Sequence, residues 1–265
     1  MGVNPVRSAT FPMKIHRCLL TVLCWSVLVV SAPAAEEVAA VIARARSFLG
    51  TEEAISRLQS VHYIGVMELV DAGAAKEAKP VRSGLEVIFQ KPYRQLMVIT
   101  SDTIIETTGL DDFDAWVRQQ QKNDPTRWRM RILAADDIRR LRAVTWENLA
   151  FFQGIEAIGG KVVDRGDTVV DGKACRKLTF THEDGSFFDR YFDNHTGQLL
   201  LTESENGTVI REEGEVLSNG LKFPRRIVTI NKEKGKVVST MTIDFDKVAT
   251  NETFDARMFA VPAAH

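Results

Sequence analysis

Cysteine is scarce in this 265-residue chain, which has only three. Two of them, Cys18 and Cys24, lie in an N-terminal apolar run, and Cys175 stands far from both. If the N-terminal run is removed, Cys175 has no partner and cannot form an internal disulfide. A lone cysteine of this kind is usually a small, buried apolar residue. We therefore expect an ordinary apolar core in place of a disulfide scaffold.

Clustered metal ligands and catalytic motifs are also missing. The histidines beyond residue 17 show no metal-site spacing: His62, His182, His195 and His265. His182 opens the turn-like stretch 182–185 and His195 lies in a second turn, so we expect both side chains to be exposed. A hydrolase would need a nucleophile, a base and an orienting acid in one pocket. The sequence predicts no enzyme, no metal and no cofactor.

A basic surface of the kind that binds nucleic acid is absent as well. The formal net charge is −1, and residues beyond 34 carry 31 bases against 35 acids. The basic clusters at 127–131 and 139–142 are local. Nucleic acid is therefore not an expected partner. With 45% hydrophobic and 26% charged residues, the composition is that of a globular protein and excludes a disordered chain.

The N-terminus has the pattern of a secretory signal peptide. Lys14 and Arg17 precede the apolar run 18–30, which is followed by small residues up to Ala34. This run is shorter than the roughly 20 residues that a membrane-spanning helix needs. We predict that residues 1–34 are a signal peptide cleaved after Ala34, and that the protein is exported to the periplasm. Translation could start at Met1 or at Met13, and the sequence does not distinguish them.

The rest of the chain, 35–265, contains no linker that would divide it, so we predict one domain. Apolar residues that recur with a period of about 3.6 residues, together with helix-ending residues, predict three helices, at 36–49, 51–61 and 135–152. β-branched and aromatic runs separated by turn residues predict strands in two sets. These strands are expected at 62–70, 84–90, 95–101, 103–110 and 113–119, and then at 161–168, 173–181, 187–192, 198–203, 208–216, 223–231 and 236–248.

Alternation along the strands predicts one apolar and one polar face. In 236–248 the odd-numbered residues, such as Met241 and Ile243, are mostly apolar, whereas the even-numbered ones are mostly polar. Short turns make neighbouring strands antiparallel. We predict an α+β fold, mostly antiparallel: a strongly curved, unclosed β-barrel of about 11 strands, with short helices covering its concave face. Such a sheet can enclose a cavity that the helices only partly fill.

This layout, together with three phrases, resembles the periplasmic lipoprotein-carrier family of LolA and LolB. "YFDNHTGQLLLTESE" is similar to that family's strand, Asp-x-x-Thr-Gly turn and strand, with Asp193, Thr196 and Gly197 in the turn. "LSNGLKFPRRIVTI" resembles a Gly-x-x-x-Pro step into a late strand, through Gly220 and Pro224. "TIDFDKVATNETFDARMF" resembles the closing strand and its short tail. The turn is also what many hairpins need, since glycine supplies a positive φ and aspartate bonds the backbone.

The resemblance implies an unclosed barrel that holds acyl chains in an apolar cavity beneath a helical lid. In the carriers an arginine near the early strands helps to hold the lid closed, and Arg82 and Arg94 are the nearest candidates here. Neither aligns with the family's arginine well enough to choose between them.

Two sets of residues are candidates for the site. The apolar set either lines a ligand cavity or fills the core: Phe89, Leu96, Val98, Trp116, Leu178, Phe180, Phe188, Leu199, Leu201, Met241, Ile243 and Phe245. The second set, Arg127, Trp128 and Arg129, either contacts a lipid head group or anionic membrane, or forms a solvated edge strand.

We predict an exported, non-enzymatic carrier that binds a lipid or lipoprotein acyl chain, of the outer-membrane lipoprotein-sorting type. It is expected to be a monomer that contacts a membrane or a membrane-bound donor and acceptor transiently. The alternative is an envelope sensor or protein-interaction module with the same fold. A carrier requires a cavity of hundreds of Å³. A module is expected to have a filled core and an apolar patch outside.

Overall fold

The computed structural model describes residues 33–73 and 79–263, which belong to one compact unit of the chain. The predicted signal peptide lies outside the described residues except for Pro33 and Ala34. The elements in chain order are α1 (Pro33–Leu49), α2 (Glu52–Arg57), β1 (Ser60–Asp71), β2 (Val81–Gln90), β3 (Arg94–Thr100), β4 (Ile104–Asp111), β5 (Asp114–Gln121), β6 (Asp124–Ile132), α3 (Ala135–Ala150), the 3₁₀ turn η1 (Ile155–Ile158), β7 (Lys161–Val170), β8 (Lys173–Thr181), β9 (Phe187–Asp193), β10 (Leu199–Ser204), β11 (Val209–Glu213), β12 (Val216–Ser218), β13 (Leu221–Phe223), β14 (Arg226–Glu233), β15 (Lys236–Thr250) and η2 (Ala256–Met258).

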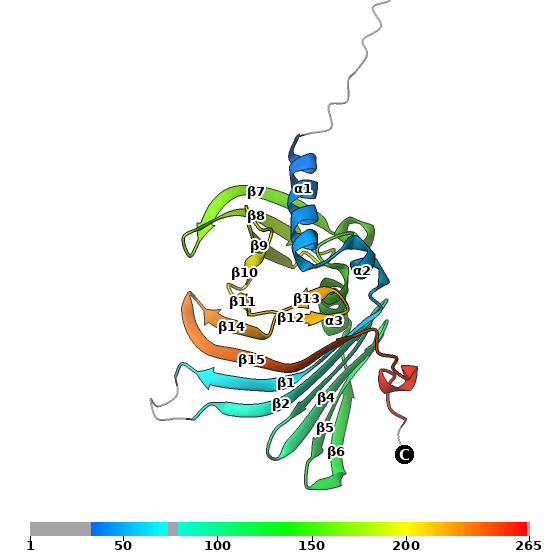
Figure 1. The fold of residues 1–265 in the computed structure, drawn as a ribbon. Helices are drawn as coiled ribbons and strands as arrows, with labels where there is room; N and C mark the ends of the chain where they lie inside the picture. Colours follow the sequence, from blue (N-terminus) through cyan, green and yellow to red (C-terminus); the bar gives the residue numbers. More distant parts are fainter. Residues whose placement is uncertain (1–32, 74–78, 264–265) are drawn as a thin grey trace, which may run out of the picture. The chain divides into compact units, whose positions relative to one another are not determined.

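Thirteen strands form one antiparallel sheet, in the order β6-β5-β4-β3-β2-β1-β15-β14-β11-β10-β9-β8-β7. The sheet is strongly curved and unclosed, with β6 and β7 at its two edges (Figure 1). The predicted fold class is confirmed, although the sheet has 13 strands where about 11 were expected. The pairing of β1 with β15 joins the first strand to the last one, so the two predicted sets of strands form a single sheet.

The three helices also form where the sequence predicts them. Thr51 accepts a hydrogen bond from the backbone N–H of Ala54 at 3.2 Å, which caps α2 as expected. The second helix is shorter than predicted because the chain enters β1 at Ser60. Among the described helices, none is both long and apolar enough to cross a membrane.

Two predicted strands are divided in the structure: 208–216 between β11 and β12, and 223–231 between β13 and β14. The expected strand 208–216 ends at Glu213, and Gly214 adopts a φ of 65° that turns the chain away from the sheet. The strands β12 and β13 then form a separate two-stranded hairpin. Its side chains Leu221 and Phe223 are buried in the core on the inner face of the sheet. The hairpin thus acts as part of the cover, a role that alternation along the strand does not reveal.

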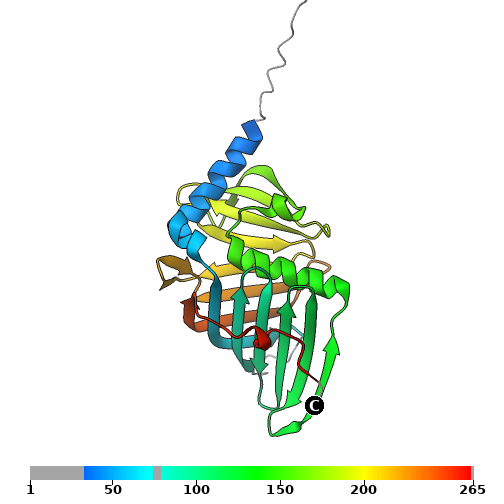
Figure 2. The ribbon, with the colours of Figure 1, turned by 90° about the vertical axis from the view of Figure 1, so that its right-hand side faces the viewer.

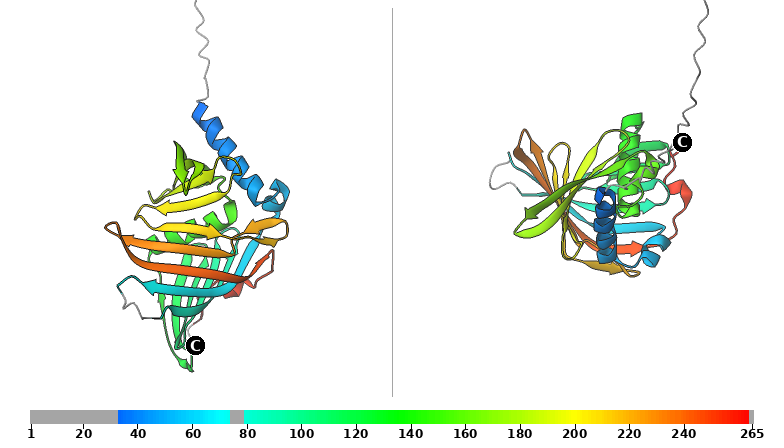
Figure 3. Two further views of the ribbon diagram at one scale, coloured as in Figure 1. Left: turned by 60° about the vertical axis from the view of Figure 1, so that its left-hand side comes forward. Right: turned by 90° about the horizontal axis from the view of Figure 1, so that it is seen from above.

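Helix α3 packs against both halves of the sheet. Leu149 and the following Phe151 belong to a core cluster with Val87 and Phe89 of β2, while Trp146 packs in a second cluster around Phe180 of β8. A helix that touches two distant parts of one sheet must lie on its concave side, and Figure 3 shows strands flanking α1 and α3 when seen from above. The prediction that helices cover the concave face is confirmed.

The outer face of the first half-sheet is covered too. The indole N–H of Trp116 donates to the carbonyl oxygen of Phe259 at 2.9 Å, and Leu96 and Ile88 pack in the same buried cluster. Figure 2 shows the C-terminal segment, in red, crossing this outer face. The parts of β2, β3 and β5 around Ile88, Leu96 and Trp116 are therefore buried on both sides. Their sequences lack the clean alternation of a strand with one wet face for this reason.

The Asp-x-x-Thr-Gly turn forms as expected. A carboxylate oxygen of Asp193 accepts from the backbone N–H groups of His195 and Thr196 at 2.8 and 2.9 Å, which hold its pKa below the usual value. Gly197 has a φ of 79°. A Cβ at Gly197 would lie 2.6 Å from the carbonyl carbon and oxygen of Arg44 in α1. The turn is therefore also the place where the second half-sheet contacts helix α1.

This contact gives a matched pair of glycine substitutions. Gly197→Ala is expected to lower the free energy of unfolding by about 2–4 kcal/mol, through left-handed backbone strain and the clash with α1. Gly207→Ala is the control, because Gly207 has the same φ of 79° but nothing within 4 Å of its added Cβ. It should cost only about 1–2 kcal/mol. Urea unfolding measures both values, and equal losses would show that the contact with α1 does not matter.

Candidate functional site

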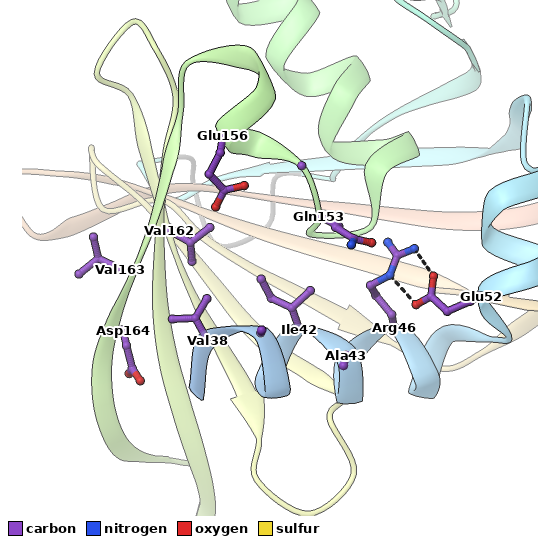
Figure 4. Close-up of a pocket in the computed structure, with 12 residues that line it drawn as sticks. Val38, Ile42, Ala43, Arg46, Glu52, Gln153, Glu156, Val162, Val163 and Asp164 are labelled. Atoms are coloured by element: carbon purple, nitrogen blue, oxygen red, sulfur yellow. Dashed lines mark hydrogen bonds and ion pairs between the residues drawn. The ribbon is translucent and has the colours of Figure 1, made fainter. Parts of the chain in front are cut away.

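A pocket of about 620 Å³ lies between helix α1 and strand β7 (Figure 4). Its apolar wall comes from two short stretches of sequence. Helix α1 contributes Val38, Ala39, Ile42 and Ala43, and β7 contributes Val162 and Val163. The floor is a buried cluster that includes Leu178, Phe180 and Phe192, against which Val38, Ile42 and Val162 pack. The small alanines of α1 leave the space that larger side chains would fill.

Polar side chains stand around this apolar wall. They are Arg46, Glu52, Gln153, Glu156 and Asp164. Asp164 pairs with Arg176 of β8 at 2.6 Å. Burial would raise the pKa of Asp164, but the hydrogen bonds from Arg176 outweigh that effect and hold the pKa below its ordinary value. Arg46 and Glu52 pair with each other, as the dashed lines in Figure 4 show. Apart from Glu156, the charged groups at the pocket are thus neutralised by partners among the described residues.

Arg46 links all three helices at the inner end of the pocket. Its Nε donates to Glu52 of α2 at 2.7 Å, and its Nη1 donates to the carbonyl oxygens of Ala150 and Phe151 at 3.0 Å each. These carbonyls are at the C-terminal end of α3, where the backbone lacks helical partners and the dipole favours a cation. Arg46 is 7% exposed. The linkage therefore fixes α1 and α2 to α3.

The two arginines that the resemblance suggested for this role lie elsewhere. Arg82 faces Glu68 at 3.5 Å on an exposed part of β1 and β2, and Arg94 pairs with Asp111 at 2.8 Å. Both pairs join strands, and neither bonds a helix within the described residues. Arg46 was missed because it lies in the predicted helix 36–49, which was identified from its apolar residues alone.

A second polar group is buried between α3 and the strands β8 and β9. The Nε2 of His182 lies 2.8 Å from Glu147 Oε1, and Arg190 Nη2 donates to Glu147 Oε2. The expectation that His182 is exposed is wrong, because it is only 6% exposed and its ring packs edge-on against Trp146 and Phe188. Its turn-like stretch begins at the end of β8, whose inner face α3 covers. His195, by contrast, is exposed in its turn.

Charge stabilises the carboxylate in this group. Burial by itself would raise the pKa of Glu147, but Arg190 and His182 together outweigh that effect and hold the pKa below its ordinary value. Ionised Glu147 therefore connects the middle of α3 to two neighbouring strands. No hydroxyl nucleophile is bonded to His182 within the described residues, and the nearby Ser186 donates to Asp184 at 2.6 Å.

The predicted cavity residues are divided between the two faces of the sheet. None of the twelve is among the described residues that line the pocket. Eight face inward: Phe89, Ile243 and Phe245 in the core beside α3, Leu178, Phe180 and Leu199 in the floor cluster, and Phe188 and Met241 on the same face by strand pairing. These eight stay predictions as ligand contacts. They form the layer on which the helices rest.

The other four face outward, which corrects the expectation that all twelve share one face. Leu96, Val98 and Trp116 pack under the C-terminal segment. Leu201 packs in an outer cluster with Cys175 and Tyr191, because an irregularity in the pairing of β10 with β9 between Leu199 and Leu201 shifts the alternation. Cys175 is fully buried there, as its interpretation as a small apolar residue predicts.

The basic segment 127–131 forms edge strand β6. Trp128 is 43% exposed and lies under the guanidinium of Arg118, with 5.0 Å from Cζ to the ring centroid. Arg129 lies on the opposite face, donates through Nε to Gln119 at 2.8 Å and lines a smaller pocket of about 390 Å³. Arg127 is exposed on the same strand. A head-group or membrane contact by these three residues stays a prediction.

Removing the Arg46 linkage should loosen the helices. Arg46→Met keeps the apolar stem but leaves two carbonyl groups without a charged donor, so we expect unfolding to become easier by about 2 kcal/mol. Amide exchange in α2 and at the end of α3 should accelerate. Arg57→Met is the control, because Arg57 pairs with Glu53 at 3.1 Å on an exposed surface and should change little. Unchanged exchange in the Arg46 variant would contradict the linkage.

Glu147 should make stability depend on acidity. Its folded pKa is lowered, so the stability it contributes is present above the unfolded pKa of about 4.3 and is lost as the pH falls through the folded pKa. The difference in unfolding free energy between wild type and Glu147→Gln should therefore shrink below about pH 5. Urea unfolding at several pH values from neutral to acid measures it. If unfolding free energy depends on pH in the same way in both proteins, the neighbours of Glu147 do not lower its pKa.

No protein-family model matches the chain, and no curated protein matches it in sequence. Solved structures do match. A LolA superfamily protein from Nitrosomonas europaea aligns with a TM-score of 0.55 and 12% identity, over 87% of this chain and 99% of that one. A DUF1329 family protein from Desulfovibrio piger gives 0.53 and 14%, over 84% and 97%. An outer membrane lipoprotein-sorting protein domain from Vibrio parahaemolyticus gives 0.54 and 9%, over 84% and 97%.

These matches cover nearly the whole of each compared protein, while the sequence identities are low. They therefore bear on the fold and not on the ligand. The resemblance that the turn, the late strand and the closing strand indicated is confirmed at the level of the fold. The open antiparallel sheet with helices on its concave side gives this chain the LolA-like fold.

Proposed function

We propose that this protein is an exported, non-enzymatic carrier that binds a lipid or lipoprotein acyl chain in the pocket beneath α1. The observation that carries the proposal is the pocket itself: about 620 Å³ beside a largely apolar wall of α1 and β7, in a LolA-like fold. This volume is in the usual range for small-molecule sites. Helix α1 forms one side of the pocket, so a movement of α1 would widen the pocket without unfolding the sheet.

Apolar burial supplies enough energy for such a ligand. Each methylene removed from water contributes about 0.8 kcal/mol, so about ten of them contribute on the order of 8 kcal/mol before the costs of association. The valine and isoleucine side chains of the pocket offer this contact without polar partners. Leu178 and Phe180, which the sequence predicted as cavity residues, form the layer beneath.

Export and membrane contact belong to the same proposal. A signal peptide over residues 1–34 would deliver the mature chain to the periplasm with the pocket-lining part of α1 intact, because that part starts at Val38. The exposed Trp128 and its arginine neighbours on edge strand β6 suit an anionic membrane surface, since tryptophan and arginine favour the interface. Transient contact there would bring the carrier to its donor or acceptor.

The alternative, a sensor or interaction module, expects a filled core and an external apolar patch. The pocket under α1 favours the carrier. An enzyme is less well supported, because His182 and Glu147 lie in a buried group outside the lining of the pocket. Their partners explain both side chains as structural.

A bulky residue in α1 tests the proposal. Ala43→Trp is expected to fill the pocket and to lower acyl-chain binding at least tenfold, because Ala43 lines it. Ala40→Trp is the control, since Ala40 is equally exposed on α1 but is not among the described lining residues. Binding is measured by native mass spectrometry of the mature protein during titration with methyl oleate. Equal uptake by both variants, or none by wild type, would refute the proposed site.

A further inference from the structure

Two buried arginines lie near the pocket, and their bonding differs. Arg46 is 7% exposed, and all three of its side-chain nitrogens donate to acceptors. Arg190 is 6% exposed, but only Nη2 has an acceptor, the carboxylate of Glu147. Its Nε and Nη1 are buried without any partner. A guanidinium carries five N–H groups, and those two nitrogens hold three of them.

The surroundings of Arg190 supply no further hydrogen-bond acceptor among the described residues. Three phenyl rings surround the guanidinium, with 4.6 Å from Cζ to the centroid of Phe180, 5.2 Å to Phe152 and 5.8 Å to Phe188. Its one carboxylate partner, Glu147, is shared with His182. Ring faces attract the cation but are far weaker acceptors than an oxygen. Buried polar groups without partners are rare in folded proteins and call for an explanation.

One layer of side chains separates Arg190 from the pocket beneath α1. Val162 in the pocket wall is paired across the strands with Phe180, whose ring lies against the guanidinium. Phe152, whose ring also lies against the guanidinium and beside that of Phe180, directly precedes Gln153 and Gly154, which also line the pocket. Displacing the Phe152 ring would therefore connect the pocket to the free N–H groups.

The backbone at this separating layer is strained. Phe151 and Phe152 follow α3 with φ values of 47° and 70°, in the left-handed region that bulky residues rarely adopt. Two consecutive residues of this kind cost stability and persist only where the surrounding structure imposes them. Phe152 is adjacent to the pocket-lining residue Gln153, and Phe151 is two residues before it. A segment held in an unfavourable conformation needs less energy to move than a relaxed one.

We propose that Arg190 is the binding site for an anionic head group, and that the ligand is a single-chain amphiphile whose carboxylate or phosphate accepts from Nε and Nη1. The acyl chain lies in the α1 pocket, and Phe152 moves aside to admit the head group. This inference rests on the proposed carrier function and adds a ligand class to it. Of the carboxylates at the rim, Glu52 and Asp164 already pair with Arg46 and Arg176, so Glu156 is the one that opposes entry of an anion among the described lining residues.

The test compares three probes on the full mature protein: sodium oleate, methyl oleate and inorganic phosphate. Wild type is expected to bind oleate at least tenfold more tightly than methyl oleate, because only oleate offers a charged acceptor. Inorganic phosphate alone should not bind. Arg190→Gln should lose the preference for oleate and keep its affinity for methyl oleate.

A second variant decides the question if Arg190→Gln does not fold. Glu147→Gln removes the internal carboxylate that competes for the guanidinium, so the preference for oleate over methyl oleate should rise. A purely structural role of the group would leave this ratio unchanged, whatever happens to stability. The ratio within one variant is insensitive to partial unfolding, since both probes meet the same protein.

The outcomes separate the two proposals. If wild type binds methyl oleate and oleate equally, the carrier function stands and the head-group site is refuted. If neither lipid binds, both proposals fall. If inorganic phosphate binds and depends on Arg190, the group is a site for a free anion and the amphiphile is refuted. A higher ratio in Glu147→Gln together with no preference in Arg190→Gln supports the head-group site.

Discussion

The apolar inner face of an open sheet must be covered, and the structure depends on how that is done. Strands β6 and β7 are the two ends of the sheet and do not pair, so curvature alone cannot close the interior. Helix α3 enters between the halves and contributes to the clusters of both. Its polar residues also bond to both halves: Thr145 to Gln95 of β3, and Glu147 to His182 after β8 and Arg190 of β9. Besides this helix, the two halves share the pairing of β1, β15 and β14 and the core that α2 and the β12–β13 hairpin form with them.

Where the cover is thin, the molecule has its pocket. Helix α1 lines the pocket with Ala39 and Ala43 beside Val38 and Ile42, whereas α3 packs the larger Trp146 and Leu149 into the core. The same end of the sheet holds the linkage through Arg46, the strained residues after α3 and the contact between Gly197 and α1. The segments that would move to admit a ligand therefore lie beside the bonds and contacts that hold them in place. Such a site can open locally while the core around Ile88, Leu96 and Trp116 stays intact.

Much of the fold could be predicted because it depends on local chemistry. The turn at Asp193 and Gly197 and the cap at Thr51 follow from residues close together in sequence. The side of the sheet to which a side chain points was predictable only where the strand pairing was regular and one face of the sheet was exposed to solvent. Leu201 was misplaced by a pairing irregularity, and Leu96 and Trp116 by a C-terminal segment that covers the outer face. His182 was misplaced because a helix distant in sequence covers the end of its strand.

The sequence by itself determined the class of structure: an antiparallel sheet with one apolar face, three helices, and an N-terminal segment with the pattern of an export signal. Periodicity, turn chemistry and composition act within a few residues, so they are legible without coordinates. Only the tertiary structure decided where the pocket lies, which arginine joins the helices and which arginine lacks acceptors. The pocket depends on the combined volumes of side chains from several elements, and Arg46 bonds to residues more than a hundred positions away. No pattern within a few residues of sequence contains that information.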